Sequence, residues 1–116
     1  MGDCERTMNE IRVGGRIDLA GKVAFVSGAS RGIGRAIAVA LAEAGADLAL
    51  TGRDSESLRR VVVNARQHGV QVWYKTAELA DETAVQRLGQ EALNEYGTID
   101  ILVNNAGLAF PQPIMN

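Results

Sequence analysis

The sequence predicts an α/β fold in which a doubly wound parallel sheet is covered by helices. Short apolar runs, typical of strands buried on both faces, alternate with segments of helical periodicity. A glycine-rich turn, Ser27-Gly28-Ala29-Ser30-Arg31-Gly32-Ile33-Gly34, joins the first apolar run to the first helical segment. Right-handed crossovers along this β-α-β-α-β-α-β pattern give the strand order 3-2-1-4.

The elements are expected in the following order. Residues 1–18 form a flexible lead-in with a break at Gly14-Gly15. Strands are expected at about 22–27, 47–51, 70–74 and 99–104, and helices at about 32–44, 55–67 and 82–96. The glycines that end the helices are Gly45, Gly69 and Gly97. The N-caps are Asp54 or Ser55 for the second helix and Asp81 for the third.

Each predicted helix carries an apolar stripe that is expected to face the sheet. In the first helix the stripe comprises Ile33, Ala36, Ile37, Ala40, Leu41 and Ala44. In the second it comprises Leu58, Val61, Val62 and Ala65, and in the third Val85, Leu88, Ala92 and Tyr96.

Composition excludes several classes of protein. The chain has 116 residues and a net charge of −2, so no basic field points to nucleic acid. Cys4 and His68 are the single cysteine and histidine, too few for a disulfide framework or a structural zinc site. No apolar run approaches the ~20 residues of a membrane helix, and the N-terminus lacks a secretory apolar region. A cytoplasmic protein that binds neither nucleic acid nor membrane is expected.

The glycine-rich turn predicts a phosphate site. It brings backbone N–H groups and a helix N-terminus to one point, where Ser30 and Arg31 would face an anion. A plain tight turn is the alternative, with Arg31 as a solvated charge. An arginine at a helix start opposes the helix dipole, however, and this favours a bound anion. The predicted sheet order places Asn104-Asn105-Ala106-Gly107 at the same switch point.

Two motifs at this separation resemble the short-chain dehydrogenase/reductase family. Gly28, Gly32 and Gly34 match its cofactor motif, with Ser27 where the family usually has threonine. The segment Asp100-Ile101-Leu102-Val103-Asn104-Asn105-Ala106-Gly107 matches its fourth-strand signature. The resemblance covers about residues 19–110 and is greatest to the 3-oxoacyl-acyl-carrier-protein reductase group. It implies a Rossmann-type fold, and its fourth-strand signature disfavours a flavin or nucleotide-sugar protein.

The resemblance implies a nicotinamide dinucleotide cofactor. The implied cofactor-binding residues are Gly28, Ala29, Ser30, Arg31, Gly32, Ile33, Gly34, Arg53, Glu78, Leu79, Asn105, Ala106 and Gly107. Glu78-Leu79 aligns with a family position that is usually Asp followed by an aliphatic residue; a surface glutamate is the alternative. Asn104 and Asn105 could instead bridge strands through buried hydrogen bonds.

Arg53 favours NADP over NAD. It ends the second strand, where an NAD enzyme has an acidic residue for the adenosine ribose. An arginine there suits a 2′-phosphate, and Arg31 could flank the same group. The alternatives are that Arg53 is a surface residue and that Asp54 takes the ribose hydroxyls.

The family transfers hydride between a nicotinamide and a carbonyl or alcohol, using a serine and a Tyr-x-x-x-Lys. Neither is identifiable here, because Glu78 and Asp100 stand four residues after the two tyrosines. No catalytic or metal-binding residue is therefore assigned. We expect residues 19–107 to be the dinucleotide-binding half of an incomplete domain and 108–116 a loop at a truncated end. The parent enzyme is expected to be a homodimer or homotetramer. The alternative is a truncated, non-catalytic fragment, at most a weak nucleotide-binding module.

Overall fold

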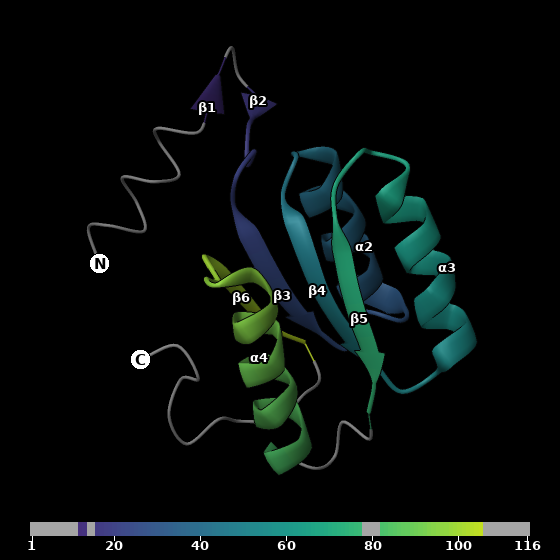
Figure 1. Cartoon of the computed structure of the whole chain (residues 1–116). Helices are drawn as coiled ribbons and strands as arrows, with labels where there is room; N and C mark the ends of the chain where they lie inside the picture. Colours follow the sequence, from purple (N-terminus) through teal and green to yellow (C-terminus); the bar gives the residue numbers. More distant parts are fainter. Residues whose placement is uncertain (1–11, 14–15, 78–81, 106–116) are drawn as a thin grey trace.

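A four-stranded parallel sheet forms the centre of the molecule (Figure 1). The computed structural model describes residues 12–13, 16–77 and 82–105. The strand order is β5-β4-β3-β6, which confirms the predicted order 3-2-1-4. The four strands are β3 (Val23–Ser27), β4 (Asp47–Gly52), β5 (Val72–Thr76) and β6 (Ile101–Asn104).

Within the described ranges, three helices cover the two faces of this sheet. Helices α2 (Gly32–Glu43) and α3 (Ser55–Arg66) lie on one face, and α4 (Glu82–Tyr96) lies on the other (Figure 1). Side chains of β3 alternate between the two faces, as the pleat requires. The core on the α2 and α3 side includes Ala24, Val26, Leu48, Leu50, Leu58, Val61 and Val62. The core on the α4 side includes Val23, Phe25, Ala49, Ala92 and Ile99.

Two strands begin two residues later than the sequence predicted. The β6 ladder starts at Ile101, because Asp100 contacts the start of β3 with its side chain: Oδ2 accepts from the Val23 N–H at 2.9 Å. Strand β5 continues through the polar residues Lys75 and Thr76, which pair with the end of β4. These polar side chains are tolerated because β5 lies at the edge of the sheet.

The predicted inward stripe of the first helix is confirmed for Leu41 and Ala44, which pack against the core, and wrong for its exposed members Ile33, Ala36 and Ala40. Gly34, Ala38 and Ala42 face the sheet in α2, whereas Ile33 is 71% exposed. Small side chains at every fourth position let the helix backbone approach the strands closely. These residues therefore occupy the buried face of α2 in place of the larger apolar residues. The stripes of α3 and α4 are confirmed: Leu58, Val61, Val62, Ala65, Val85, Leu88 and Ala92 are buried and Tyr96 is half-buried.

The ends of the helices follow the sequence signals. Gly45, Gly69 and Gly97 come directly or shortly after α2, α3 and α4 and have φ of 100°, 83° and 80°, respectively. Asp54, not Ser55, caps α3. The predicted cap Asp81 lies outside the described residues. None of the helices within the described ranges is long and apolar enough to cross a membrane.

A short antiparallel ladder lies near the start of β3 (Figure 1). Strands β1 (Arg12–Val13) and β2 (Arg16–Ile17) pair with Arg12 opposite Ile17. Such two-residue strands carry no usable periodicity, so the sequence predicted only a flexible lead-in here.

Tyr96 ties α4 to the amino end of β4. Its hydroxyl donates to the Leu48 carbonyl at 2.9 Å. Burial, and next the negative charge of Asp47, raise the pKa of Tyr96 above its ordinary value of 10.0.

We expect Tyr96→Phe to change how stability depends on pH. The pKa of Tyr96 is raised on folding. Its contribution to the free energy of unfolding is therefore fully present below the pKa of the unfolded state, and it is lost as the pH rises through the pKa of the folded state. Between pH 7 and pH 11 the urea midpoint should fall less for Tyr96→Phe than for the parent chain. At pH 7 the variant should lose about 1 kcal/mol with the hydrogen bond. Tyr74→Phe, on the exposed edge strand, is the control; an unchanged pH dependence in Tyr96→Phe would contradict the assignment.

Candidate functional site

The glycine-rich turn leaves β3 and enters α2 at the carboxyl end of the sheet. Gly28 and Gly32 have φ of 67° and 63°, a left-handed conformation that favours glycine. Apart from the adjoining backbone, no atom of the described residues lies within 4 Å of the position where a Cβ would stand on Gly32. The turn therefore has an open side on which a ligand can approach the backbone.

Gly34 sits where no side chain fits. A Cβ there would run into the Gly28 carbonyl oxygen and would lie 2.5 Å from Nδ2 of Asn105. Asn105 donates from the same Nδ2 to the Gly28 carbonyl at 3.2 Å. The first turn of α2, the glycine loop and the end of β6 are thus packed directly on one another, as the sequence predicted for these two motifs.

Ser27 joins β3 to β6 beneath the loop. Its fully buried hydroxyl accepts from the Asn105 N–H at 3.1 Å and lies 3.2 Å from Oδ1 of Asn104. The alternative role of the asparagine side chains as bridges is thus present in the structure: Asn104 contacts Ser27 of β3, and Asn105 donates to the carbonyl of Gly28 directly after β3. It is compatible with a ligand role for Asn105, whose side chain is half-buried.

The end of β4 meets the same loop. The Ala29 N–H donates to the Thr51 carbonyl at 2.9 Å, so this N–H holds the loop to the sheet. A Cβ on Gly52 would lie 2.9 Å from the Cβ of Ser30, which is almost fully buried. Arg53, exposed, follows directly after Gly52. The glycine loop and the turn that carries Arg53 are thus in contact.

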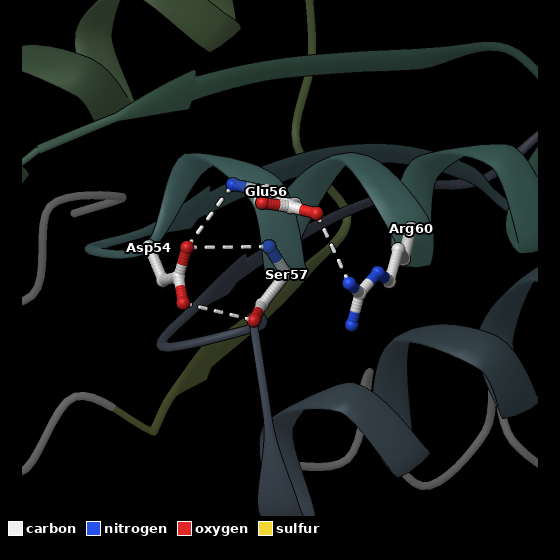
Figure 2. A network of polar contacts seen from close by, with 4 residues as sticks. All are labelled: Asp54, Glu56, Ser57 and Arg60. Carbon is white, nitrogen blue, oxygen red and sulfur yellow. Dashed lines mark hydrogen bonds and ion pairs between the residues drawn. The ribbon is translucent and has the colours of Figure 1, made fainter.

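The two helices beside the site begin in different ways. Asp54 caps α3 and accepts from the N–H groups of Glu56 and Ser57 at 3.1 and 3.3 Å and from the Ser57 hydroxyl at 3.0 Å (Figure 2). The hydrogen bonds from Ser57 hold the pKa of Asp54 below its ordinary value. Helix α2 has Arg31 at its N-cap, no side-chain cap and no acidic residue in its first turn.

This N-terminus suits an anion. In the first turn of α2 the Arg35 N–H donates to the Arg31 carbonyl at 3.4 Å, so the N–H groups of residues 32–34 precede the hydrogen-bond ladder of the helix. These donors, the positive end of the helix dipole and the exposed cationic side chain of Arg31 favour negative charge at one point. The glycines leave room for a phosphate against the backbone. A pyrophosphate fits the residues present.

Four of the predicted site residues, Glu78, Leu79, Ala106 and Gly107, lie outside the described residues. The last described residue before Glu78 is Ala77, whose N–H donates to the Gly52 carbonyl at 3.0 Å. Ile33 is largely exposed at the first turn of α2. No cluster of three potential metal ligands occurs in the part of the chain that the structure describes.

The family model for short chain dehydrogenase matches residues 22–116. The chain belongs to the short-chain dehydrogenase family. The resemblance drawn from the two motifs is therefore confirmed. The family is one of NAD(P)-dependent oxidoreductases.

Several members of the short-chain dehydrogenase family are similar to this chain. The 3-oxoacyl-[acyl-carrier-protein] reductase of Aquifex aeolicus is 42% identical over 93 residues, 79% of this chain and 38% of the relative. An alcohol dehydrogenase from Thermococcus sibiricus, solved with 5-hydroxy-NADP, is 38% identical with a TM-score of 0.65 and is matched over 70% of this chain and 35% of its own. Carveol dehydrogenase from Mycobacterium avium, solved with NAD, is 30% identical with a TM-score of 0.71, over 78% of this chain and 37% of its own. The chain thus spans under two fifths of each of these short-chain dehydrogenases.

Sequence reasoning missed two residues that shape this short-chain dehydrogenase site. Gly52 was assigned only to a turn, although its missing side chain lets Ser30 pack against β4. Ser27 was noted only as a departure from the usual threonine, although its buried hydroxyl ties two strands together. A polar residue at the end of an otherwise apolar strand was the available signal for Ser27.

We expect Asn105→Ala to weaken both the fold and ligand binding. The substitution removes the hydrogen bond to the Gly28 carbonyl and should lower the free energy of unfolding by about 1 kcal/mol. Affinity for ADP-ribose should fall several-fold, because the glycine loop is no longer held in position by the hydrogen bond from Asn105. Urea melts and calorimetric titration measure the two effects. Asn64→Ala, at an exposed position of α3, should change neither; equal losses in both variants would contradict the positioning role of Asn105.

Proposed function

We propose that this chain is the cofactor-binding part of an NADP-preferring oxidoreductase. The reaction is hydride transfer between the nicotinamide and a carbonyl or secondary alcohol. Bound NADP supplies the hydride chemistry, and the residues of this chain bind its adenosine-pyrophosphate end. The observation that carries the cofactor preference is the arginine, rather than a carboxylate, directly after β4.

The structure supports this preference through Asp54. This carboxylate is the acidic group nearest in sequence to Arg53, and both of its oxygens accept hydrogen bonds within the first turn of α3 (Figure 2). Taking the ribose hydroxyls would cost these capping bonds. Arg53 lies beside the loop that carries Arg31, because Gly52 contacts Ser30. Two exposed guanidinium groups near one loop suit a 2′-phosphate.

Binding of 2′-phospho-ADP-ribose and ADP-ribose tests the preference without involving the nicotinamide. Calorimetric titration of the chain should give a dissociation constant roughly tenfold lower for the phosphorylated ligand, as expected for one charge-assisted contact. NADPH and NADH should follow the same order. Tighter binding of ADP-ribose would contradict the preference for NADP while leaving the dinucleotide site intact.

A second proposal is that the 116-residue chain has no reductase activity by itself. Tyr96 donates its hydroxyl to Leu48 near the amino end of β4, whereas the glycine loop lies at the carboxyl end. Tyr74 lies on β5 and has Glu78 four residues later. Neither tyrosine is paired with a lysine as the family chemistry requires. Incubation of the chain with NADPH and a 3-oxoacyl thioester should show no NADPH oxidation, and turnover would overturn this proposal.

A further inference from the structure

Gly52 is the last residue of β4, and its backbone conformation does not require a glycine. Gly28 and Gly32 in the neighbouring loop have a positive φ, whereas Gly52 does not. A glycine in a strand loses more conformational freedom on folding than a residue with a side chain, and it often marks a close approach of another segment. The reason for a glycine at this buried position therefore lies in its surroundings.

The surroundings of Gly52 leave no room for a side chain. A Cβ there would lie 2.9 Å from the Cβ of Ser30, 3.0 Å from its Oγ and 3.3 Å from its amide nitrogen. The Oγ of a serine can rotate away, but its Cβ is attached directly to the backbone. A side chain at position 52 therefore requires a shift of the backbone of either the loop or the strand.

Hydrogen bonds hold both of these backbone segments. On one side of the contact, the Ala77 N–H donates to the Gly52 carbonyl at 3.0 Å. On the other side, the Ala29 N–H donates to the Thr51 carbonyl at 2.9 Å, and Ser30 is only 7% exposed. The contact between Ser30 and Gly52, which we call the Ser30–Gly52 pair, is thus fixed from both sides.

The pleat of β4 shows where a side chain at position 52 would point. Leu48 and Leu50 belong to the core beneath α2 and α3, and position 52 lies on the same face of the strand. A side chain there would point toward the glycine loop at the start of α2. In dinucleotide-binding folds, a carboxylate near the end of the second strand binds the adenosine ribose hydroxyls of NAD. Ser30 fills the space that the first carbon atom of such a side chain would need.

We infer that the Ser30–Gly52 pair is a second determinant of cofactor preference, because it excludes a ribose-binding carboxylate from the end of β4. The inference rests on the proposed preference for NADP. The next two positions are consistent with it: position 53 is an arginine, and the Asp54 carboxylate accepts hydrogen bonds from the first turn of α3 (Figure 2). Excluding the groups that would recognise the wrong ligand is a general source of specificity.

The steric part of the inference is tested without a ligand by Gly52→Ala, which adds only a Cβ. The urea midpoint should fall by about 1 M in the parent chain, and by less than half as much when the same substitution is made in a Ser30→Gly background. Ser30→Ala is the matched background, since it removes the Oγ but keeps the Cβ; the loss there should equal that in the parent chain. Equal losses in the Ser30→Gly and Ser30→Ala backgrounds would overturn the Ser30–Gly52 pair. If Gly52→Ala folds only together with Ser30→Gly, the pair is supported; if it folds in neither background, the pair is overturned.

The effect on preference is tested by Gly52→Asp, with calorimetric titration of ADP-ribose and 2′-phospho-ADP-ribose. In the Ser30→Gly background, Gly52→Asp should raise the affinity for ADP-ribose about tenfold and lower that for the phosphorylated ligand. In the Ser30→Ala background it should not raise the affinity for ADP-ribose. A gain of the same size in both backgrounds, or in neither, would overturn the inference.

The two proposals fail in different ways. Tighter binding of ADP-ribose by the parent chain would refute the preference for NADP, whatever the urea midpoints show. Equal urea losses in the two backgrounds would refute the Ser30–Gly52 pair, even where the parent chain binds the phosphorylated ligand more tightly.

Discussion

Gly34→Ala should cost the chain about 3 kcal/mol of unfolding free energy and abolish dinucleotide binding. The added methyl would meet the Gly28 carbonyl and lie 2.9 Å from the Gly28 carbonyl carbon. Both are backbone atoms of the loop, so relief requires the loop or α2 to move as a whole. A loss of this size is a large fraction of the stability of a small domain.

Urea denaturation, followed by the fluorescence of Trp73, the single tryptophan, measures the effect of Gly34→Ala. Gly69→Ala is the matched control. Gly69 also forms a turn, with φ of 83°, but beyond its two chain neighbours no atom in the described part of the chain lies within 4 Å of its Cβ position. Its substitution should cost only about 1 kcal/mol, the conformational penalty of a left-handed residue, and leave binding intact. If the two variants were equally stable, close packing of α2 on the loop would not be the reason for a glycine at position 34.

Arg53→Asp should reverse the cofactor preference. Loss of charge-assisted contacts worth about 1.5–3 kcal/mol corresponds to roughly ten- to a hundredfold weaker binding of NADPH. The new carboxylate would repel the 2′-phosphate and could accept hydrogen bonds from the ribose hydroxyls of NADH. The ratio of the two dissociation constants is therefore the decisive quantity.

Arg59→Asp makes the same change of charge on the exposed side of α3 and is the control for Arg53→Asp. It should leave the ratio of the NADPH and NADH constants unchanged, although net charge lowers both affinities slightly. A ratio that shifts equally in both variants would mean that only the overall charge matters, and Arg53 would lose its specific role.

The arrangement of the sheet could be predicted from the sequence because it depends on patterns that extend over many residues. Apolar runs and helix caps indicated the order of the elements along the chain. The right-handedness of β-α-β crossovers then indicated the order of the strands in the sheet. The starts of β5 and β6 could not be predicted, because each depends on a partner far away in sequence: Val72 pairs with Leu48, and the Asp100 carboxylate accepts from Val23. The α2 stripe failed for its exposed members because periodicity marks apolar positions without saying which of two apolar faces meets the sheet.

The site could be predicted as far as its glycines and motif residues. Gly28, Gly34 and Asn105 meet as the motifs imply. The uses of individual polar groups could not be predicted. The Ala29 N–H is engaged by Thr51, and the Asp54 carboxylate is engaged by its own helix. Such local hydrogen bonds depend on backbone geometry that residue types do not specify.

The link between Ser27, Gly28 and Asn105 also has a consequence for folding. These bonds join residues 77 or 78 positions apart, so nearly the whole described chain must be in place before the loop acquires its final form. Contacts of such high contact order form late and are lost early when β6 detaches. Dinucleotide binding should therefore report on completed folding rather than on α2 and its turn alone. By mass action, a ligand present at about 100 times its dissociation constant would add about 2.7 kcal/mol to the stability of the assembled sheet. The cofactor would thereby act as the last structural element to join the fold.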